Sequence, residues 1–251
     1  MAMTRMVLRE GLAMNNNSSL DTLRNVRFWR PGQVEYERAL AWQNARIVGL
    51  ASGSEGEVIA LLEHPPVYTL GVRGKDEHFL SAPDVLAIRG ASIVRTNRGG
   101  DVTFHGPGQL VVYPILDLRA RGLGAAAYVR ALEATIVEAL ITFGVTGERI
   151  RGRPGVWVDG AKLAAIGVRI SRGVSSHGLA LNVSTDLDWF DAIIPCGIPD
   201  IKVTSLERLL AQPLSMQVVE DALIDAFARV FDSLLHAGPA AAHKAFTRAV
   251  S

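Results

Sequence analysis

Residues 156–183 read VWVDGAKLAAIGVRISRGVSSHGLALNV, and this stretch decides the fold class. It contains three runs rich in apolar and β-branched residues, which are typical of strands: Val156 to Val158, Leu163 to Ile170 and Val174 to Val183. Asp159-Gly160 predicts a tight hairpin turn after the first run, and Ser171-Arg172-Gly173 predicts a second turn. The stretch therefore predicts an antiparallel meander.

Strand and helix patterns on either side of this meander do not alternate regularly. Apolar residues at helical spacing predict helices from Ala125 to Phe143 and from Ser215 to Leu235, while Pro31-Gly32 is predicted to open an earlier helix. Helices grouped around an antiparallel or mixed sheet, without regular β-α-β units, indicate an α+β fold. Further strands are predicted at Val26 to Trp29, Val58 to Leu62, Ser92 to Thr96 and Leu110 to Leu116.

The composition indicates one compact domain. Apolar residues make up 49% of the 251 residues and supply ample core. The 26 basic and 25 acidic residues leave a net charge of +1, which gives no electrostatic footprint for nucleic acid. We expect residues 1–23 to be a disordered leader that does not read as a signal peptide, residues 24–238 to form the domain, and residues 239–251 to be a C-terminal tail.

The chain shows no pattern for a metal, a disulfide or a membrane span. Its one cysteine cannot form an internal disulfide and fits a reducing compartment, so we expect a cytoplasmic protein. The six histidines are scattered without metal-ligand spacing, and we expect no metal and no cofactor. The most apolar long segment, Leu123 to Val145, is interrupted by Arg130, Glu133 and Glu138, so no membrane association is expected.

A glycine-rich segment from Arg98 to Gly108 is the first place where chemistry is expected. It lies between two predicted strands and lacks both the ending of a phosphate-binding loop and the spacing of a dinucleotide fingerprint. Four polar side chains are mounted on or beside it: Arg98, Thr103, His105 and Gln109. Such a loop is suited to a flat or elongated ligand, which the backbone approaches closely and a few polar groups fix.

Cys196 and Lys162 are the candidate reactive side chains. A lone cysteine is usually a small buried hydrophobe, but the flanking Pro195 and Gly197 place Cys196 in a stiff, irregular turn open to a ligand. Lys162 follows a predicted turn and precedes an apolar run, so its side chain either snorkels to solvent or lies buried. A buried lysine near a thiol can lower the thiol's pKa or accept its proton.

Several ordered blocks of the sequence closely resemble lipoyl(octanoyl) transferases. The resemblance covers the chain from about Val26 to the last predicted helix, and the blocks together are far more specific than any one of them. They are Glu63-His-Pro-Pro-Val-Tyr-Thr-Leu-Gly71, Arg98-Gly-Gly-Asp-Val-Thr-Phe-His-Gly-Pro-Gly-Gln109, Tyr113, Lys162-Leu-Ala-Ala-Ile-Gly167, His177-Gly-Leu-Ala-Leu-Asn182 and Pro195-Cys196-Gly197.

This resemblance implies the first step of endogenous protein lipoylation. An octanoyl group would pass from octanoyl-acyl carrier protein to the lysine of apo lipoyl domains in 2-oxoacid dehydrogenase complexes and of the glycine-cleavage H protein. The fold would resemble the catalytic domains of biotin protein ligases and lipoate ligases, and residues 24–238 would be the catalytic domain. Cys196 would carry the acyl thioester and Lys162 would tune it. The substrate-binding residues would be Arg98, Gly99, Gly100, Asp101, Val102, Thr103, Phe104, His105, Ala165, Ile166, Gly167, Gly178, Leu179 and Ala180.

Two other functions remain open from the sequence. An ATP-dependent lipoate or biotin ligase would share the fold, and Arg151-Gly-Arg-Pro-Gly155 superficially resembles the arginine-glycine loop of biotin ligases, although an ordinary turn before a strand explains it. A catalytically idle acyl-binding protein would not need both Cys196 and Lys162. His105 and His177 are expected to position groups or to line the pocket, and backbone amides near Gly99, Gly100 and Gly167 are candidates for the oxyanion site.

Overall fold

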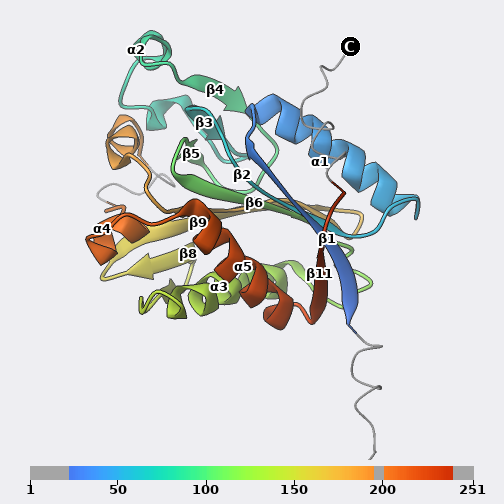
Figure 1. Ribbon diagram of the computed structural model, residues 1–251. Coiled ribbons are helices and arrows are strands. Elements are labelled where there is room, and N and C mark those ends of the chain that lie inside the picture. Colours follow the sequence, from blue (N-terminus) through green and yellow to red (C-terminus); the bar gives the residue numbers. More distant parts are fainter. Residues whose placement is uncertain (1–22, 195–200, 240–251) are drawn as a thin grey trace, which may run out of the picture.

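The computed structural model describes residues 23–194 and 201–239, and within these the largest element is an eight-stranded mixed sheet (Figure 1). Its strand order is β11-β1-β2-β6-β10-β9-β8-β7. β11 and β2 run parallel to β1, and all other neighbours are antiparallel. The strands are β1 (Arg24–Gln33), β2 (Val58–Glu63), β6 (Gln109–Ile115), β7 (Glu148–Ile150), β8 (Arg153–Val158), β9 (Ala161–Ser171), β10 (Val174–Asn182) and β11 (Ser233–Ala237).

The predicted meander is confirmed as β8, β9 and β10. Its two turns each place two consecutive residues at positive φ: Asp159 (48°) with Gly160 (75°), and Arg172 (53°) with Gly173 (88°). Two successive left-handed residues match the right-handed twist of the flanking strands, which explains why these short loops form hairpins.

Alternating side chains of the sheet supply two separate cores. In β2, Ile59 and Leu61 pack on one side with α3 (Ala125–Ile141) and α5 (Met216–Val230). Val58, Ala60 and Leu62 pack on the other side with α1 (Tyr36–Ala51). Figure 1 shows α1 and the pair α3 and α5 on opposite sides of the sheet. The predicted helix from Ala125 is confirmed, because its stripe residues Tyr128, Leu132, Ile136 and Leu140 are all buried.

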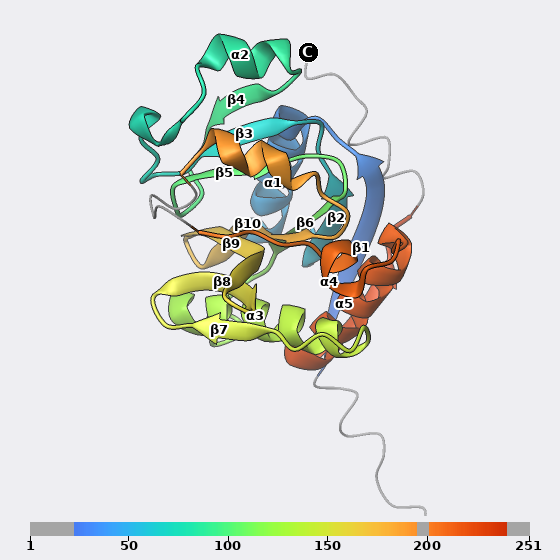
Figure 2. The same ribbon diagram turned by 90° about the vertical axis from the view of Figure 1, so that its left-hand side faces the viewer.

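A three-stranded sheet covers part of the α1 side of the large sheet (Figure 2). Its strand order is β4-β3-β5, and an aromatic core lies beneath it that includes Tyr68, Phe104 and Phe190. The elements of this region are β3 (Val67–Leu70), η1 (Asp76–His78), α2 (Pro83–Ile88), β4 (Ser92–Arg95), β5 (Val102–His105) and η2 (Leu187–Ala192); the short α4 (Leu206–Leu210) follows later in the chain.

Three secondary-structure predictions from the sequence were wrong: where one helix begins, where another ends, and a loop that contains a strand. Pro31-Gly32 does not open a helix: the register between β1 and β2 shifts between Trp29 and Gly32, so the proline lies in a strand irregularity, where its missing N–H costs nothing. The last helix ends at Val230, and β11 follows it because β1 offers a parallel edge that local periodicity does not reveal. The glycine-rich segment, expected as a loop, contains strand β5.

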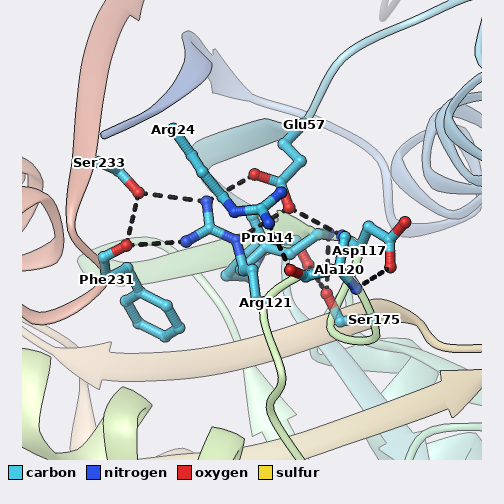
Figure 3. Close-up of polar contacts among 10 residues, drawn as sticks. Arg24, Glu57, Pro114, Asp117, Ala120, Arg121, Ser175, Phe231 and Ser233 are labelled. Carbon is cyan, nitrogen blue, oxygen red and sulfur yellow. Dashed lines mark hydrogen bonds and ion pairs between the residues drawn. The ribbon is translucent and has the colours of Figure 1, made fainter. Parts of the chain in front are cut away.

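An internal ion pair joins segments that lie far apart in the sequence (Figure 3). The Arg121 Nε and Nη2 atoms donate to the two carboxylate oxygens of Glu57 at 2.8 and 2.5 Å, and both side chains are more than nine-tenths buried. Arg121 also donates to the Phe231 carbonyl and to the Ser233 hydroxyl. This cluster ties the start of β2 and the segment before α3 to the start of β11.

No helix in the described ranges is long and apolar enough to cross a membrane. Within the same ranges, no group of three or more histidine, cysteine, aspartate or glutamate side chains is arranged to hold a metal ion.

Candidate active site

A cavity of about 280 Å³ lies where the glycine-rich segment faces β6, β9 and β10. This volume is close to the lower end of the range typical of small-molecule sites, about 300–1,000 Å³. Every residue of the predicted substrate-binding set except Phe104 lines it, and Lys162 lines it too. The sequence did not single out several other lining residues: Tyr36, Arg73, Val111, Val129, Trp157, Val168 and Ile201.

Phe104 lies outside the cavity because successive side chains of β5 point to opposite faces of the strand. Thr103 and His105 line the cavity, whereas the intervening Phe104 points into the aromatic core and stacks on Trp189 with ring centroids 5.1 Å apart. Residues on one strand that differ by a single position face opposite sides of the sheet. Val102, two positions before Phe104 on the same strand, also packs in this aromatic core, although it lines the cavity as well.

The glycines of the site allow backbone segments to approach each other closely. A Cβ atom on Gly167 would lie 2.9 Å from the Gly99 carbonyl oxygen, and one on Gly71 would lie 2.4 Å from the Gly100 carbonyl oxygen. The Gly99 amide donates to the Val168 carbonyl at 2.9 Å. The glycine-rich segment is thus held between the end of β3 and the edge of β9, and the Gly99 amide is occupied instead of facing a substrate.

Arg98 fixes the shape of this segment. Its Nε and Nη2 atoms donate to the Thr69 hydroxyl at 3.0 and 2.9 Å, and Nη2 also donates to the carbonyls of Thr69 and Asp101 at 2.5 and 2.6 Å. Its Nη1 atom donates to the Gly99 carbonyl at 2.9 Å. A planar guanidinium carries five N–H donors in a fixed arrangement and can reach acceptors on several sides, whereas the three donors of a lysine all leave one nitrogen. Arg98 therefore organises the loop as well as lining the cavity.

A buried chain of hydrogen bonds continues from Thr69 through the sheet. His105 contacts the Thr69 hydroxyl through Nε2 at 3.4 Å and the Gln109 Oε1 atom through Nδ1 at 2.7 Å. The Gln109 amide nitrogen donates to Asn182 Oδ1, and the Asn182 amide nitrogen donates to the Thr204 carbonyl. Because Gln109 Oε1 can only accept, the proton of His105 lies on Nδ1. The chain connects the glycine-rich segment to the strand segment beside Lys162.

The histidine and tyrosine side chains that α1, β5, β6 and β10 present to the cavity are uncharged near neutral pH. Burial lowers the pKa of His177 to about 4, with the positive charges of Arg98 and Arg169 adding to the effect. Burial also lowers the pKa of His105 well below its usual value and raises the pKa values of Tyr36 and Tyr113. These histidines are consequently weak bases, which agrees with the expected positioning role.

An irregularity in β9 turns Lys162 toward the cavity. Val156 pairs with Ala164 but Trp157 pairs with Lys162, so Leu163 is an extra residue on β9. Leu163 and Ala164 both pack into the core beneath α3, and the alternation of side chains therefore resets at this point. As a result, the Lys162 side chain is 7% exposed and lines the cavity instead of the core.

Cys196 lies outside the described residues, but the chain on both sides of residues 195–200 is placed. Before this gap, the Ile194 amide donates to the His78 carbonyl at 2.8 Å. After it, Ile201 lines the cavity, the Lys202 carbonyl accepts from the Lys162 amide at 2.7 Å, and the Thr204 amide donates to the Lys162 carbonyl at 3.0 Å. The segment that leads away from Cys196 is therefore hydrogen-bonded to Lys162 itself.

In the discounted Arg151-to-Gly155 run, only Arg151 and Gly152 form a turn, because β8 already begins at Arg153. Arg151 and Gly152 connect β7 to β8, with Gly152 at φ 81°. Gly152, Arg153 and Pro154 nevertheless line the cavity. The sequence alone offered no sign of this, because the contact depends on how β8 diverges from β9 beyond Ala165.

The family model that matches residues 35–228 describes the lipoyl protein ligase A/B catalytic domain. An octanoyltransferase from Acidobacterium capsulatum is 49% identical to this chain, with 80% of this chain and 87% of that protein covered. An octanoyltransferase from Chloroflexus aggregans is 45% identical, with 84% and 96% covered. The chain therefore belongs to the lipoyl protein ligase A/B catalytic domain family and, within it, to the octanoyltransferases, which are acyltransferases.

A solved structure of lipoate-protein ligase A bound with ATP superposes with a TM-score of 0.71, covering 90% of this chain and 93% of that one. Its 15% sequence identity shows the shared fold alone. The expected α+β fold of the lipoate ligase type and the family resemblance are both confirmed.

Proposed function

We propose that the chain transfers an octanoyl group from octanoyl-acyl carrier protein to the lysine of apo lipoyl domains through a thioester on Cys196. The acceptors would be lipoyl domains of 2-oxoacid dehydrogenase complexes and the glycine-cleavage H protein, and the reaction would take place in the cytoplasm. The observation that carries this proposal is the placement of Lys162: it faces the cavity, and the chain that follows Cys196 is hydrogen-bonded to its backbone.

The proposed chemistry has two half-reactions. In the first, Lys162 takes the proton of the Cys196 thiol, the thiolate attacks the acyl carbon, a new sulfur–acyl bond forms as the carrier's sulfur–acyl bond breaks, and the carrier leaves as its thiol with the proton that Lys162 returns. In the second, the acceptor amine attacks the same carbon, an amide forms, the proton of the amine passes to Lys162, and the Cys196 thiolate is released. Both steps need an ammonium or amine beside the sulfur, and neither needs a nucleotide because the donor is already activated.

The surroundings of the cavity suit this role. The small side chains of Ala165 and Ala180 leave room along the strands for a narrow chain, and the buried histidines add no charge that would oppose an apolar acyl group. Since the Gly99 amide donates to Val168 and Gly167 pairs with Gly178 in the sheet, the Gly100 amide is the better candidate for stabilising the oxyanion.

Intact mass of the protein after incubation with octanoyl-acyl carrier protein tests this function. We expect one added octanoyl group that hydroxylamine releases, and no such adduct in Cys196→Ala. The transfer to an apo lipoyl domain should keep its full rate in EDTA without nucleotide. An adduct that persists in Cys196→Ala would show a different nucleophile, and strict dependence on ATP with free octanoate would place the chain with the ligases.

A further inference from the structure

The side chain of Trp157 lies opposite Lys162 on the neighbouring strand and faces the same cavity. The two residues are a register pair between β8 and β9, and Trp157 is 1% exposed. The Lys162 Nζ atom lies 5.3 Å from the centroid of the indole ring. A cation at this distance over an aromatic face is attracted by the negative face of the ring.

Two further features fix this geometry. The Trp157 Nε1 atom donates to the Arg153 carbonyl at 3.3 Å, which orients the ring. Gly155 lies at φ 129°, and a Cβ atom there would be 3.0 Å from the Lys162 Cε atom and 2.3 Å from the Ala164 carbonyl oxygen. The glycine therefore leaves space for the lysine stem, and the strand irregularity at Leu163 turns that stem toward the ring.

We propose that Trp157 is a positioning residue that holds the Lys162 ammonium at the cavity. This inference rests on the proposed function, in which Lys162 acts on the Cys196 thiol. An aromatic ring stabilises the ammonium without introducing a negative charge, which would repel the thiolate that the ammonium must support. Trp157 itself touches no reacting atom in this assignment.

The pH dependence of thiol alkylation tests the proposal. Cys196 is the one cysteine of the chain, so alkylation by iodoacetamide reports on a single thiolate. Trp157→Leu is expected to move the midpoint of alkylation to higher pH, by up to about 1.5 units, because the ammonium is less firmly held near the sulfur. Trp157→Phe keeps an aromatic face and should move it less. In a Lys162→Ala background, Trp157→Leu should cause no further shift.

Trp42→Leu is the matched control, because Trp42 is a buried indole in α1 that packs in the α1 core and does not line the cavity. It should lower the thermal midpoint of unfolding without moving the alkylation midpoint. The proposal is overturned if Trp157→Leu leaves the midpoint unchanged, if its shift persists in Lys162→Ala, or if Trp42→Leu causes the same shift. Failure of the proposed function would appear separately, as the absence of an octanoyl adduct on the wild-type protein.

Discussion

At the scale of single residues, the chemistry of Lys162 separates two roles that the structure allows. A positive charge beside the thiol needs only a cation, whereas a proton shuttle needs a group that can lose its proton, which arginine cannot do. We expect Lys162→Arg to lose nearly as much octanoyl transfer as Lys162→Ala, on the order of a hundredfold or more. Rates of both half-reactions would be measured, because the amine must lose a proton only in the second.

Lys75 provides the control for this series. It is exposed and pairs with Glu77 on the surface, so Lys75→Arg and Lys75→Ala should both retain wild-type rates. Substantial transfer by Lys162→Arg would reduce the lysine's role to its charge. Wild-type rates in Lys162→Ala would remove it from the mechanism.

The sequence identified the residue types of the site better than their orientations. Arg98, Lys162 and the glycines could be found because few other residues combine charge or backbone freedom with those neighbours. Trp157 could not be found, since its position opposite Lys162 depends on the extra residue Leu163 in β9, which shifts the strand register by one. Cys196 stays a prediction, because it lies outside the described residues.

At the scale of elements, the β8–β9 hairpin depends on Gly155, where the neighbouring strand leaves no space for a Cβ atom. In Gly155→Ala the new methyl group would meet the Ala164 carbonyl oxygen at 2.3 Å in addition to the cost of φ 129°. Gly152→Ala is the matched control, because Gly152 also has positive φ (81°) but has no atom within 4 Å of a Cβ position. We expect Gly155→Ala to lower the free energy of unfolding in urea by about 2 kcal/mol more than Gly152→Ala does. Equal losses would show that the close approach can relax.

Elements defined by local signals were predicted well, and those defined by distant partners were not. The meander follows from its turns, and α3 follows from its apolar stripe. β11 was assigned to the preceding helix because Leu234 continues the spacing of Val230, and only the free edge of β1 decides otherwise. β3 and β5 are strands of four residues each in the small sheet, where β3 pairs with both β4 and β5, and the glycines around β5 concealed them.

At the scale of the whole molecule, the buried pair of Glu57 and Arg121 connects the start of β2 to the segment before α3, and Arg121 extends the connection to the start of β11 (Figure 3). Removing one partner leaves an uncompensated buried charge, so Arg121→Ala should lower the free energy of unfolding by about 3–5 kcal/mol. Arg95→Ala removes a similar contact to Asp76 between side chains that are 65% and 77% exposed, and it should cost less than about 1 kcal/mol. Urea unfolding would measure both. A similar small loss for the two variants would contradict a structural role for the buried pair.

The buried neutral histidines should make the whole fold sensitive to acid. In His64 the Nδ1–H group donates to the Val34 carbonyl at 2.6 Å, Nε2 accepts from the Tyr113 hydroxyl at 2.8 Å, and burial lowers the pKa to about 4 from 6.5. The unfolded chain therefore binds a proton as the pH falls below about 6.5, while the folded protein binds it only near pH 4. The stabilisation is complete above pH 6.5 and is lost progressively between these two values, at up to about 1.4 kcal/mol per pH unit for each such histidine.

We expect the free energy of unfolding in urea to fall from pH 7 to pH 4.5, and to fall less steeply, by about 1 kcal/mol per pH unit, in His64→Gln. Glutamine keeps hydrogen-bonding groups but does not titrate, so the variant removes this proton without removing the other acid-sensitive groups. The control is His236→Gln, because His236 is exposed and its removal should leave the slope unchanged. If His64→Gln retained the wild-type slope, proton binding at His64 in the unfolded chain would not be a source of the acid sensitivity. His177 would then be the next residue to substitute, because burial lowers its pKa to about 4 as well.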